Sequence, residues 1–150
     1  IKVNNKISQY FVKKYYEPDL KLKFTNSLLK LANTSIDISD GLIDDLKKMI
    51  NRQSVSFHIF EKNIPISNTL SQLIEIKKLR KIDITSRGDD YQILFTANPI
   101  KSRIIKRISN NTGIKITKIG KIIPGKNKSK IINIKNKQIE AKNKGYIHRF

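Results

Sequence analysis

The residues best suited to chemistry form an acidic run over 37–45. Its acids are Asp37, Asp40, Asp44 and Asp45. Like charges this close repel unless a cation or a polar ligand neutralises them. Magnesium typically takes one or two carboxylates together with substrate phosphates, and the spacing of Asp37 and Asp40 suits that arrangement. The run therefore favours a magnesium site, in which Ser39 could donate a hydrogen bond to a phosphate and Gly41 would let the backbone approach the ligand closely.

A purely structural role explains part of the same pattern. Ser39 or Asp40 could cap the helix expected next in the chain, a role worth about 1 kcal/mol. A cap does not account for Asp37, which strand alternation places on the face opposite Ile36 and Ile38. Both interpretations are open at this point.

A second acidic segment covers residues 86–92. Asp89 and Asp90 follow Gly88 there and stand directly before an apolar stretch. The segment could be a polar turn in which Asp90 bonds its own backbone. It also fits a substrate-contacting loop held beside a rigid strand.

The composition narrows the chemistry further. The chain has 150 residues, enough for one domain or a small domain with an extension. The absence of cysteine excludes disulfides, thiolate zinc sites and a cysteine nucleophile, and His58 and His148 are too few for a histidine-rich zinc site. The absence of cysteine also fits the cytoplasm, where we expect the protein, and with no apolar run long enough to cross a bilayer we expect a soluble chain without a membrane partner. The first residue, Ile1, indicates a fragment or a processed product.

The formal net charge of +19 raises the possibility of a nucleic-acid-binding module. The lysines are spread along the chain, however, and the densest run lacks the aromatic residues that stack on bases. That run consists of Lys126, Lys128, Lys130, Lys135 and Lys137. A solvated face or hairpin is the favoured interpretation, which disfavours nucleic acid as a partner.

Hydrophobic periodicity predicts elements that would position both acidic segments. Helices are expected over 6–16, from Asp19 to Leu31, after Gly41, over 68–79 and from Pro99 to Ile108. Strands are expected over 34–38, 55–60, 91–96, 114–123 and 130–134, with the last two joined by a turn at Pro124-Gly125. The order predicts an α+β fold with a mixed or mostly antiparallel sheet packed with helices. The acidic run would lie at a strand-to-helix junction, where a helix N-terminus presents free N–H groups to phosphate oxygens. Asp44 and Lys48 would pair across one helical turn.

Several motifs together resemble the C-terminal half of thiamine-monophosphate kinases. In chain order they are Ser35-Ile36-Asp37-Ile38-Ser39-Asp40-Gly41-Leu42, Gly88-Asp89-Asp90-Tyr91, Thr117-Lys118-Ile119-Gly120, and Gly145-Tyr146 with His148 and Phe150. The resemblance implies a lead-in segment over 1–18 from an N-terminal domain, then a domain over 19–150 similar to the C-terminal domain of aminoimidazole ribonucleotide synthetase-like proteins.

The resemblance also implies an activity. The family transfers the γ-phosphoryl group of ATP to thiamine monophosphate, giving thiamine diphosphate, with Mg²⁺ and no covalent enzyme intermediate. Asp37 and Asp40 take the places of magnesium ligands, Ser39 that of an ATP contact, and Asp89 and Tyr146 those of substrate contacts. The resemblance assigns no covalent catalytic residue to this chain.

The same resemblance places part of the site outside these residues. The N-terminal domain of the same protein would supply further ligands and the interface of a homodimer, so we expect the 150 residues alone to be inactive. One alternative keeps the scaffold but assigns another ATP-using reaction of aminoimidazole ribonucleotide synthetase-like enzymes. The other is the basic nucleic-acid-binding module.

Overall fold

The computed structural model describes residues 3–142 and contains helices and strands in mixed order. The helices are α1 (Asn5–Tyr16), α2 (Thr25–Leu31), α3 (Leu42–Met49), α4 (Asn68–Ile76), α5 (Lys81–Thr85) and α6 (Ser102–Thr112). Single 3₁₀ turns are η1 (Leu22–Phe24), η2 (Glu61–Asn63) and η3 (Pro99–Lys101). The strands are β1 (Thr34–Asp37), β2 (Val55–Phe60), β3 (Ile93–Thr96), β4 (Gly120–Pro124), β5 (Lys130–Ile132) and β6 (Gln138–Ile139). No helix within residues 3–142 has the length and apolar character needed to cross a membrane.

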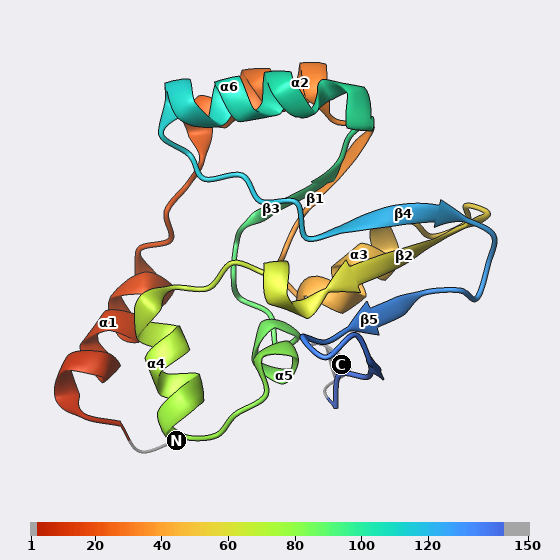
Figure 1. The fold of residues 1–150 in the computed structure, drawn as a ribbon. Helices are drawn as coiled ribbons and strands as arrows, with labels where there is room; N and C mark the ends of the chain where they lie inside the picture. The colour runs from red at the N-terminus through yellow and green to blue at the C-terminus, as the bar shows by residue number, and fades with distance from the viewer. Residues whose placement is uncertain (1–2, 143–150) are drawn as a thin grey trace, which may run out of the picture.

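Two separate sheets organise the fold (Figure 1). β1 and β3 form an antiparallel pair in which Thr34 lies opposite Thr96 and Asp37 lies opposite Ile93. The second sheet has the order β4-β2-β5-β6, with β2 antiparallel to β4 and parallel to β5. The α+β class with a mixed sheet is thus confirmed.

The expected hairpin around Pro124-Gly125 is wrong. β4 and β5 do not pair with each other, because β2 lies between them and pairs with both. β2 has buried Phe57 and Ile59, so a central position between two partners suits it better than an edge. The connecting turn is tied to β2, since Ser56 Oγ donates to the carbonyl oxygen of Gly125 at 2.6 Å and accepts from the N–H of Lys128 at 3.0 Å.

Two other expectations need adjustment. Of the strand predicted over 114–123, only residues 120–123 belong to β4, which ends at Pro124. The helix predicted over 68–79 ends at Ile76, and the short α5 after it was not expected. Lys78 adopts a left-handed φ of 50°, which ends the helical path before Leu79. The lysines of the basic run are all exposed, as a solvated surface requires.

The hydrophobic core lies between α3 and the strands. Its α3 members are Leu42, Ile43, Leu46 and Met49, which recur with helical spacing and bury one side of the helix. They belong to one cluster with Phe57 and Ile59 of β2, Ile82 of α5, Leu94 of β3 and Ile131 of β5. This packing fixes α3 relative to both sheets, and so fixes the short loop between β1 and α3.

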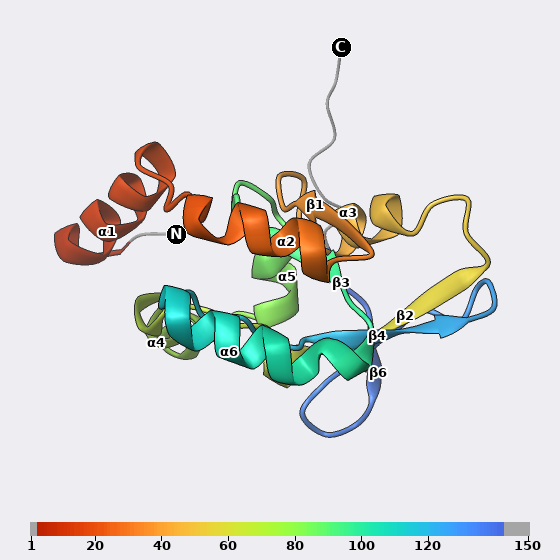
Figure 2. The same ribbon diagram turned by 90° about the horizontal axis from the view of Figure 1, so that it is seen from above.

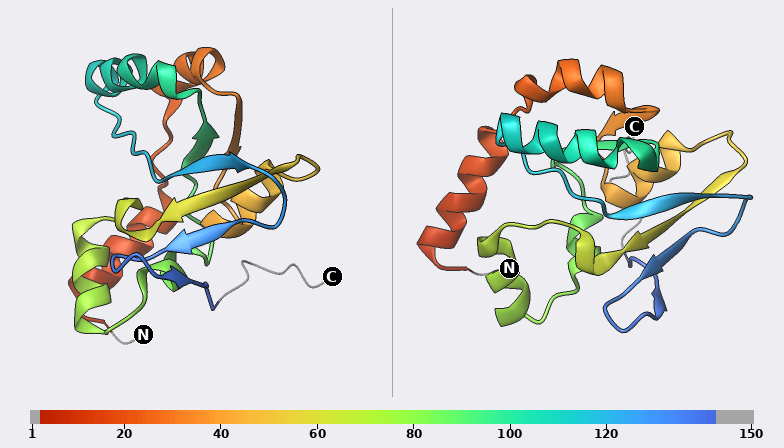
Figure 3. Two further views of the ribbon diagram at one scale, coloured as in Figure 1. Left: turned by 45° about the vertical axis from the view of Figure 1, so that its right-hand side comes forward. Right: turned by 45° about the horizontal axis from the view of Figure 1, so that its top comes forward.

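α2 and α6 lie beyond the outer end of the β1–β3 pair (Figures 1 and 3). Lys101 Nζ donates to the carbonyl oxygens of Lys30 and Leu31 at the end of α2, at 3.0 and 3.2 Å. The rings of Phe24 and Phe95 are 5.6 Å apart between centroids. α1 projects from the rest of the molecule, and each of its residues is at least partly exposed (Figure 2). The domain boundary predicted after residue 18 stays a prediction.

Candidate functional site

The first acidic segment occupies the end of β1, the loop after it and the start of α3. Asp37 is the last residue of β1 and its side chain is exposed, whereas Ile36 is half-buried and Ile38 is buried. The alternation predicted for this strand therefore holds, and Asp37 faces solvent. Within residues 3–142, the carboxylate of Asp37 makes no hydrogen bond or ion pair.

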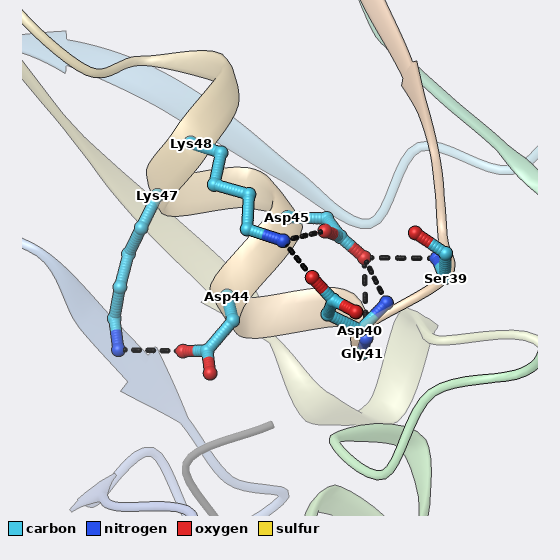
Figure 4. Close-up of polar contacts among 7 residues, drawn as sticks. All are labelled: Ser39, Asp40, Gly41, Asp44, Asp45, Lys47 and Lys48. Carbon is cyan, nitrogen blue, oxygen red and sulfur yellow. Dashed lines mark hydrogen bonds and ion pairs between the residues drawn. The ribbon is translucent and has the colours of Figure 1, made fainter. Parts of the chain in front are cut away.

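The loop between β1 and α3 is organised by Asp45, which is only 1% exposed. Its Oδ2 atom accepts hydrogen bonds from the backbone N–H groups of Ser39, Asp40 and Gly41 at 3.0, 2.9 and 3.1 Å (Figure 4). A buried carboxylate loses its hydration, and charge-assisted bonds from amides compensate for that loss. The loop is therefore wrapped around one carboxylate of the helix that follows it.

This arrangement corrects two expectations. Neither Ser39 nor Asp40 caps α3, because Gly41 occupies the N-cap position and no side chain bonds there. The N–H groups of residues 39–41 point inward to Asp45, so these three amides are not free to bind phosphate oxygens. Phosphate binding by this loop would have to use side chains or other amides.

Lys48 provides a second link between the loop and α3. Its Nζ atom bonds Asp45 Oδ1 at 2.9 Å and also pairs with the carboxylate of Asp40. Both hydrogen bonds raise the pKa of Lys48, the bond to Asp40 more than that to Asp45. The expected pair of Asp44 with Lys48 is wrong: Asp44 pairs with Lys47 at 2.9 Å, away from the loop (Figure 4).

The second acidic segment lies directly against the first. The N–H of Asp89 donates to the carbonyl oxygen of Ser39, and the N–H of Tyr91 donates to that of Ile38, both at 2.9 Å. In the opposite direction, the N–H of Ile38 donates to the carbonyl oxygen of Gln92 at 2.9 Å. The β1–β3 pairing thus continues past the strand ends and brings the two acidic segments together.

Two glycines make this close approach possible. A Cβ on Gly41 would lie 2.5 Å from the carbonyl oxygen of Ser86, and one on Gly88 would lie 2.3 Å from that of Ser39. Both residues also have positive φ, +116° and +99°. Each segment therefore places a glycine against the backbone of the other. The close approach expected of Gly41 to a ligand is an approach to Ser86 in this structure.

The electrostatics of the second segment are set by its own acids. Asp89 and Tyr91 have left-handed φ values of 59° and 48°, and Tyr91 Oη donates to Asp89 Oδ1 at 3.3 Å. The charge of Asp89 is the main cause of the raised pKa of Tyr91. Partial desolvation raises the pKa of Asp90 to about 6, and the charge of Asp89 adds to the rise. Non-glycine residues with positive φ are uncommon and often gather at functional sites.

The donors in these segments suit a hard cation. Carboxylate and hydroxyl oxygens are the ligands that Mg²⁺ prefers, and the Lys48 ammonium already lies at the Asp40 carboxylate. Within residues 3–142, no group of three or more histidine, aspartate or glutamate side chains is arranged to hold a metal by itself. The chemistry of these donors therefore suits Mg²⁺, but the described residues do not form a complete site.

Comparison with known proteins places the chain. It is 32% identical over 148 residues to thiamine-monophosphate kinase of Buchnera aphidicola subsp. Schizaphis graminum, a match that covers 97% of this chain and 44% of that relative. The chain belongs to the thiamine-monophosphate kinase family. It spans less than half the length of this relative. No protein-family model matches it.

Solved structures of thiamine-monophosphate kinases share the fold. The enzyme from Aquifex aeolicus superposes with a TM-score of 0.68 at 25% identity, over 93% of this chain and 44% of that one. AaThiL complexed with AMPPCP and TMP gives a TM-score of 0.70 at 25% identity, over 98% and 44% of the two chains.

The structure brings four of the five predicted site residues together. Asp37, Ser39, Asp40 and Asp89 lie within the two joined segments, and Tyr146 lies outside the described residues. The sequence reasoning missed Asp45 and Lys48 as the residues that hold the loop. An acid in the first turn of a helix is a known capping signal, but it points to Asp44 and Asp45 alike and does not separate them.

The glycine contacts predict that alanine destabilises the fold more at position 88 than at position 113. Gly88→Ala should lower the free energy of unfolding by about 3 kcal/mol, because the Cβ meets a carbonyl oxygen as well as an unfavourable φ. Gly113→Ala is the matched control, since its φ is +69° but a Cβ there has open space within 4 Å; it should cost about 1 kcal/mol. Urea denaturation measures both, and equal losses would contradict the close approach.

The role of Asp45 predicts that two adjacent acids differ greatly in their effect on stability. Asp45→Ala should cost about 3 kcal/mol, because it leaves three loop amides without their acceptor and removes one of the two carboxylates that pair with Lys48. Asp44→Ala removes only a surface pair and should cost less than about 1 kcal/mol. Chemical denaturation of both variants tests this, and a stable Asp45→Ala protein would refute the assigned role.

The raised pKa of Asp90 predicts a pH dependence of stability. The folded state favours the protonated form, so the contribution of Asp90 to stability falls as the pH rises through about 6. Asp90→Asn should therefore raise the melting temperature more at pH 8 than at pH 4.5. Solvent screening limits the gain to about 1 kcal/mol. An equal change at both pH values would show that Asp90 does not titrate in this way.

Proposed function

We propose that this chain is part of an ATP-dependent kinase that converts thiamine monophosphate to thiamine diphosphate. The observation that carries the proposal is the pair of acidic segments joined at the β1–β3 end, in a chain related over 97% of its length to a thiamine-monophosphate kinase. AMPPCP is an ATP analogue, and a relative that binds it together with TMP supports ATP and thiamine monophosphate as the two substrates.

In this proposal the first acidic segment binds Mg²⁺ and ATP. Asp37 and Asp40 hold Mg²⁺, and the Ser39 side chain contacts ATP. Bound magnesium neutralises the charge on the phosphate oxygens, which is a major part of catalysis of phosphoryl transfer. Asp45 does not touch substrate but keeps Ser39 and Asp40 in place through their backbone N–H groups.

In the same proposal the second acidic segment binds the acceptor substrate, thiamine monophosphate. Asp89 contacts thiamine monophosphate, and Tyr146, outside the described residues, packs on it. Asp89 is fixed by the bond from its N–H to Ser39 and by its left-handed backbone. Since Ser39 belongs to the ATP side, this bond links the positions of the two substrates.

The charge of the two segments supports cation binding. Residues 37–48 and 86–92 together contain six acids and three bases, although the whole chain has a net charge of +19. Cations that neutralise this local charge would ease the approach of a triphosphate, which supports a bound metal.

The remaining parts of the site belong to a longer protein in this proposal. An N-terminal domain supplies further metal ligands and the dimer interface, and the enzyme works in the cytoplasm as a homodimer. The 44% coverage of the Buchnera relative is consistent with a missing domain.

Activity measurements on matched variants test the proposal. In the longer protein containing these residues, Asp37→Asn and Asp40→Asn should each lower kcat for ADP release dependent on thiamine monophosphate by at least about 100-fold. Asp44→Asn should stay within about twofold, because Asp44 pairs outward with Lys47. The 150 residues alone should release no ADP with Mg²⁺, ATP and thiamine monophosphate. Near-normal turnover in both Asp37→Asn and Asp40→Asn would refute the metal assignment.

A further inference from the structure

Lys48 occupies an unusual position for a surface lysine. Its ammonium lies between two carboxylates, those of Asp40 in the loop and Asp45 in the same helix (Figure 4). The lysine side chain is 49% exposed, so solvent reaches the ammonium on one side. The single positive charge therefore pairs with a buried carboxylate and a more exposed carboxylate at the same time.

The two acids differ in how firmly they are held. Asp45 is 1% exposed and its other oxygen accepts three amide hydrogen bonds, so its position is fixed. The Asp40 side chain is 21% exposed, and its backbone is anchored through its N–H to Asp45. Asp40 can consequently change its side-chain partner while its backbone stays in place.

We propose that Lys48 is a built-in counter-cation for Asp40 that competes with the divalent cation. This rests on the metal role of Asp40 in the proposed function. Without metal, the ammonium neutralises Asp40. When metal binds, Asp40 exchanges Lys48 for the cation, and Lys48 keeps its bond to Asp45 Oδ1.

Lys48 competes only weakly with the metal for Asp40. Asp40 and Lys48 are both accessible to solvent, and ion pairs of this kind change an equilibrium by about two- to fivefold. The lysine therefore opposes metal binding only weakly. The loop does not collapse on exchange, because the three amide bonds to Asp45 do not involve Lys48.

The neighbouring pair provides an internal control. Lys47 pairs with Asp44 on the same helix at 2.9 Å, which is also the distance between Lys48 and Asp45. Neither Lys47 nor Asp44 bonds the loop over 38–41. Lys48→Met and Lys47→Met remove the same charge from α3. A difference between them reports the contacts of Lys48 with Asp40 and Asp45 and not the general charge of the helix.

The first measurement is Mn²⁺ affinity, with Mn²⁺ as the probe for the site. Paramagnetic broadening of the Asp40 and Gly41 amide signals, in the longer protein that contains these residues and in its variants, locates the ion and gives its Kd. Lys48→Met should bind Mn²⁺ about two- to fivefold more tightly than Lys47→Met. Equal affinity, or weaker binding by Lys48→Met, would overturn the inference.

The second measurement follows the lysine directly in the unaltered chain. The ¹⁵Nζ signal of Lys48 should move as Mg²⁺ is added, whereas that of Lys47 should not. A silent Lys48 signal while the Asp40 amide responds to Mg²⁺ would also overturn the inference.

The two measurements separate this inference from the proposed function. Binding of Mn²⁺ at the loop with equal affinity in both variants would refute the role of Lys48 and leave the metal assignment intact. No binding at the loop in the unaltered chain or in either variant would refute the metal role of Asp40, and the role of Lys48 with it.

Discussion

The arrangement of the acidic segments depends on one buried carboxylate, that of Asp45. Moving a charged group out of water is costly unless hydrogen bonds and an opposite charge replace its hydration. Asp45 obtains these from three consecutive loop amides and from Lys48. Because the amides belong to residues 39–41, the requirement of one side chain dictates the path of the loop. Asp40 and Ser39 thereby gain fixed backbones on a segment with no regular structure of its own.

The sequence predicted the elements that depend on local patterns. The limits of β2 were correct, and β1, α3 and α6 were placed within a few residues, because alternation and helical spacing identify such segments. The pairing of strands was less predictable. A turn signal such as Pro124-Gly125 suggests a hairpin, yet β2 takes the place between β4 and β5 through contacts far away in the chain. Local patterns carry no information about that competition.

In the candidate site, too, local features could be predicted and contacts between distant residues could not. The chemistry predicted from the residue types at Asp37, Asp40 and Asp89 stays a prediction, whereas strand alternation gave the correct faces for Ile36 and Asp37 of β1. What could not be predicted was which atoms would satisfy one another. Asp45 was one acid among several in the sequence, and only its burial distinguishes it from Asp44. The contacts of Gly41 with Ser86 and of Gly88 with Ser39 likewise join residues more than forty positions apart.

The long separation between β1 and β3 has a consequence for the order of folding during synthesis. β1 ends at residue 37 and β3 begins at residue 93, so the first acidic segment leaves the ribosome well before its partner. Until then, the edge of β1 lacks the strand that it pairs with in the finished fold. Contacts between distant residues form slowly, and an unpaired edge is prone to wrong associations. The contact between Asp45 and the loop involves only residues 39–45, so it can form early and protect the acidic segment while the chain is still growing.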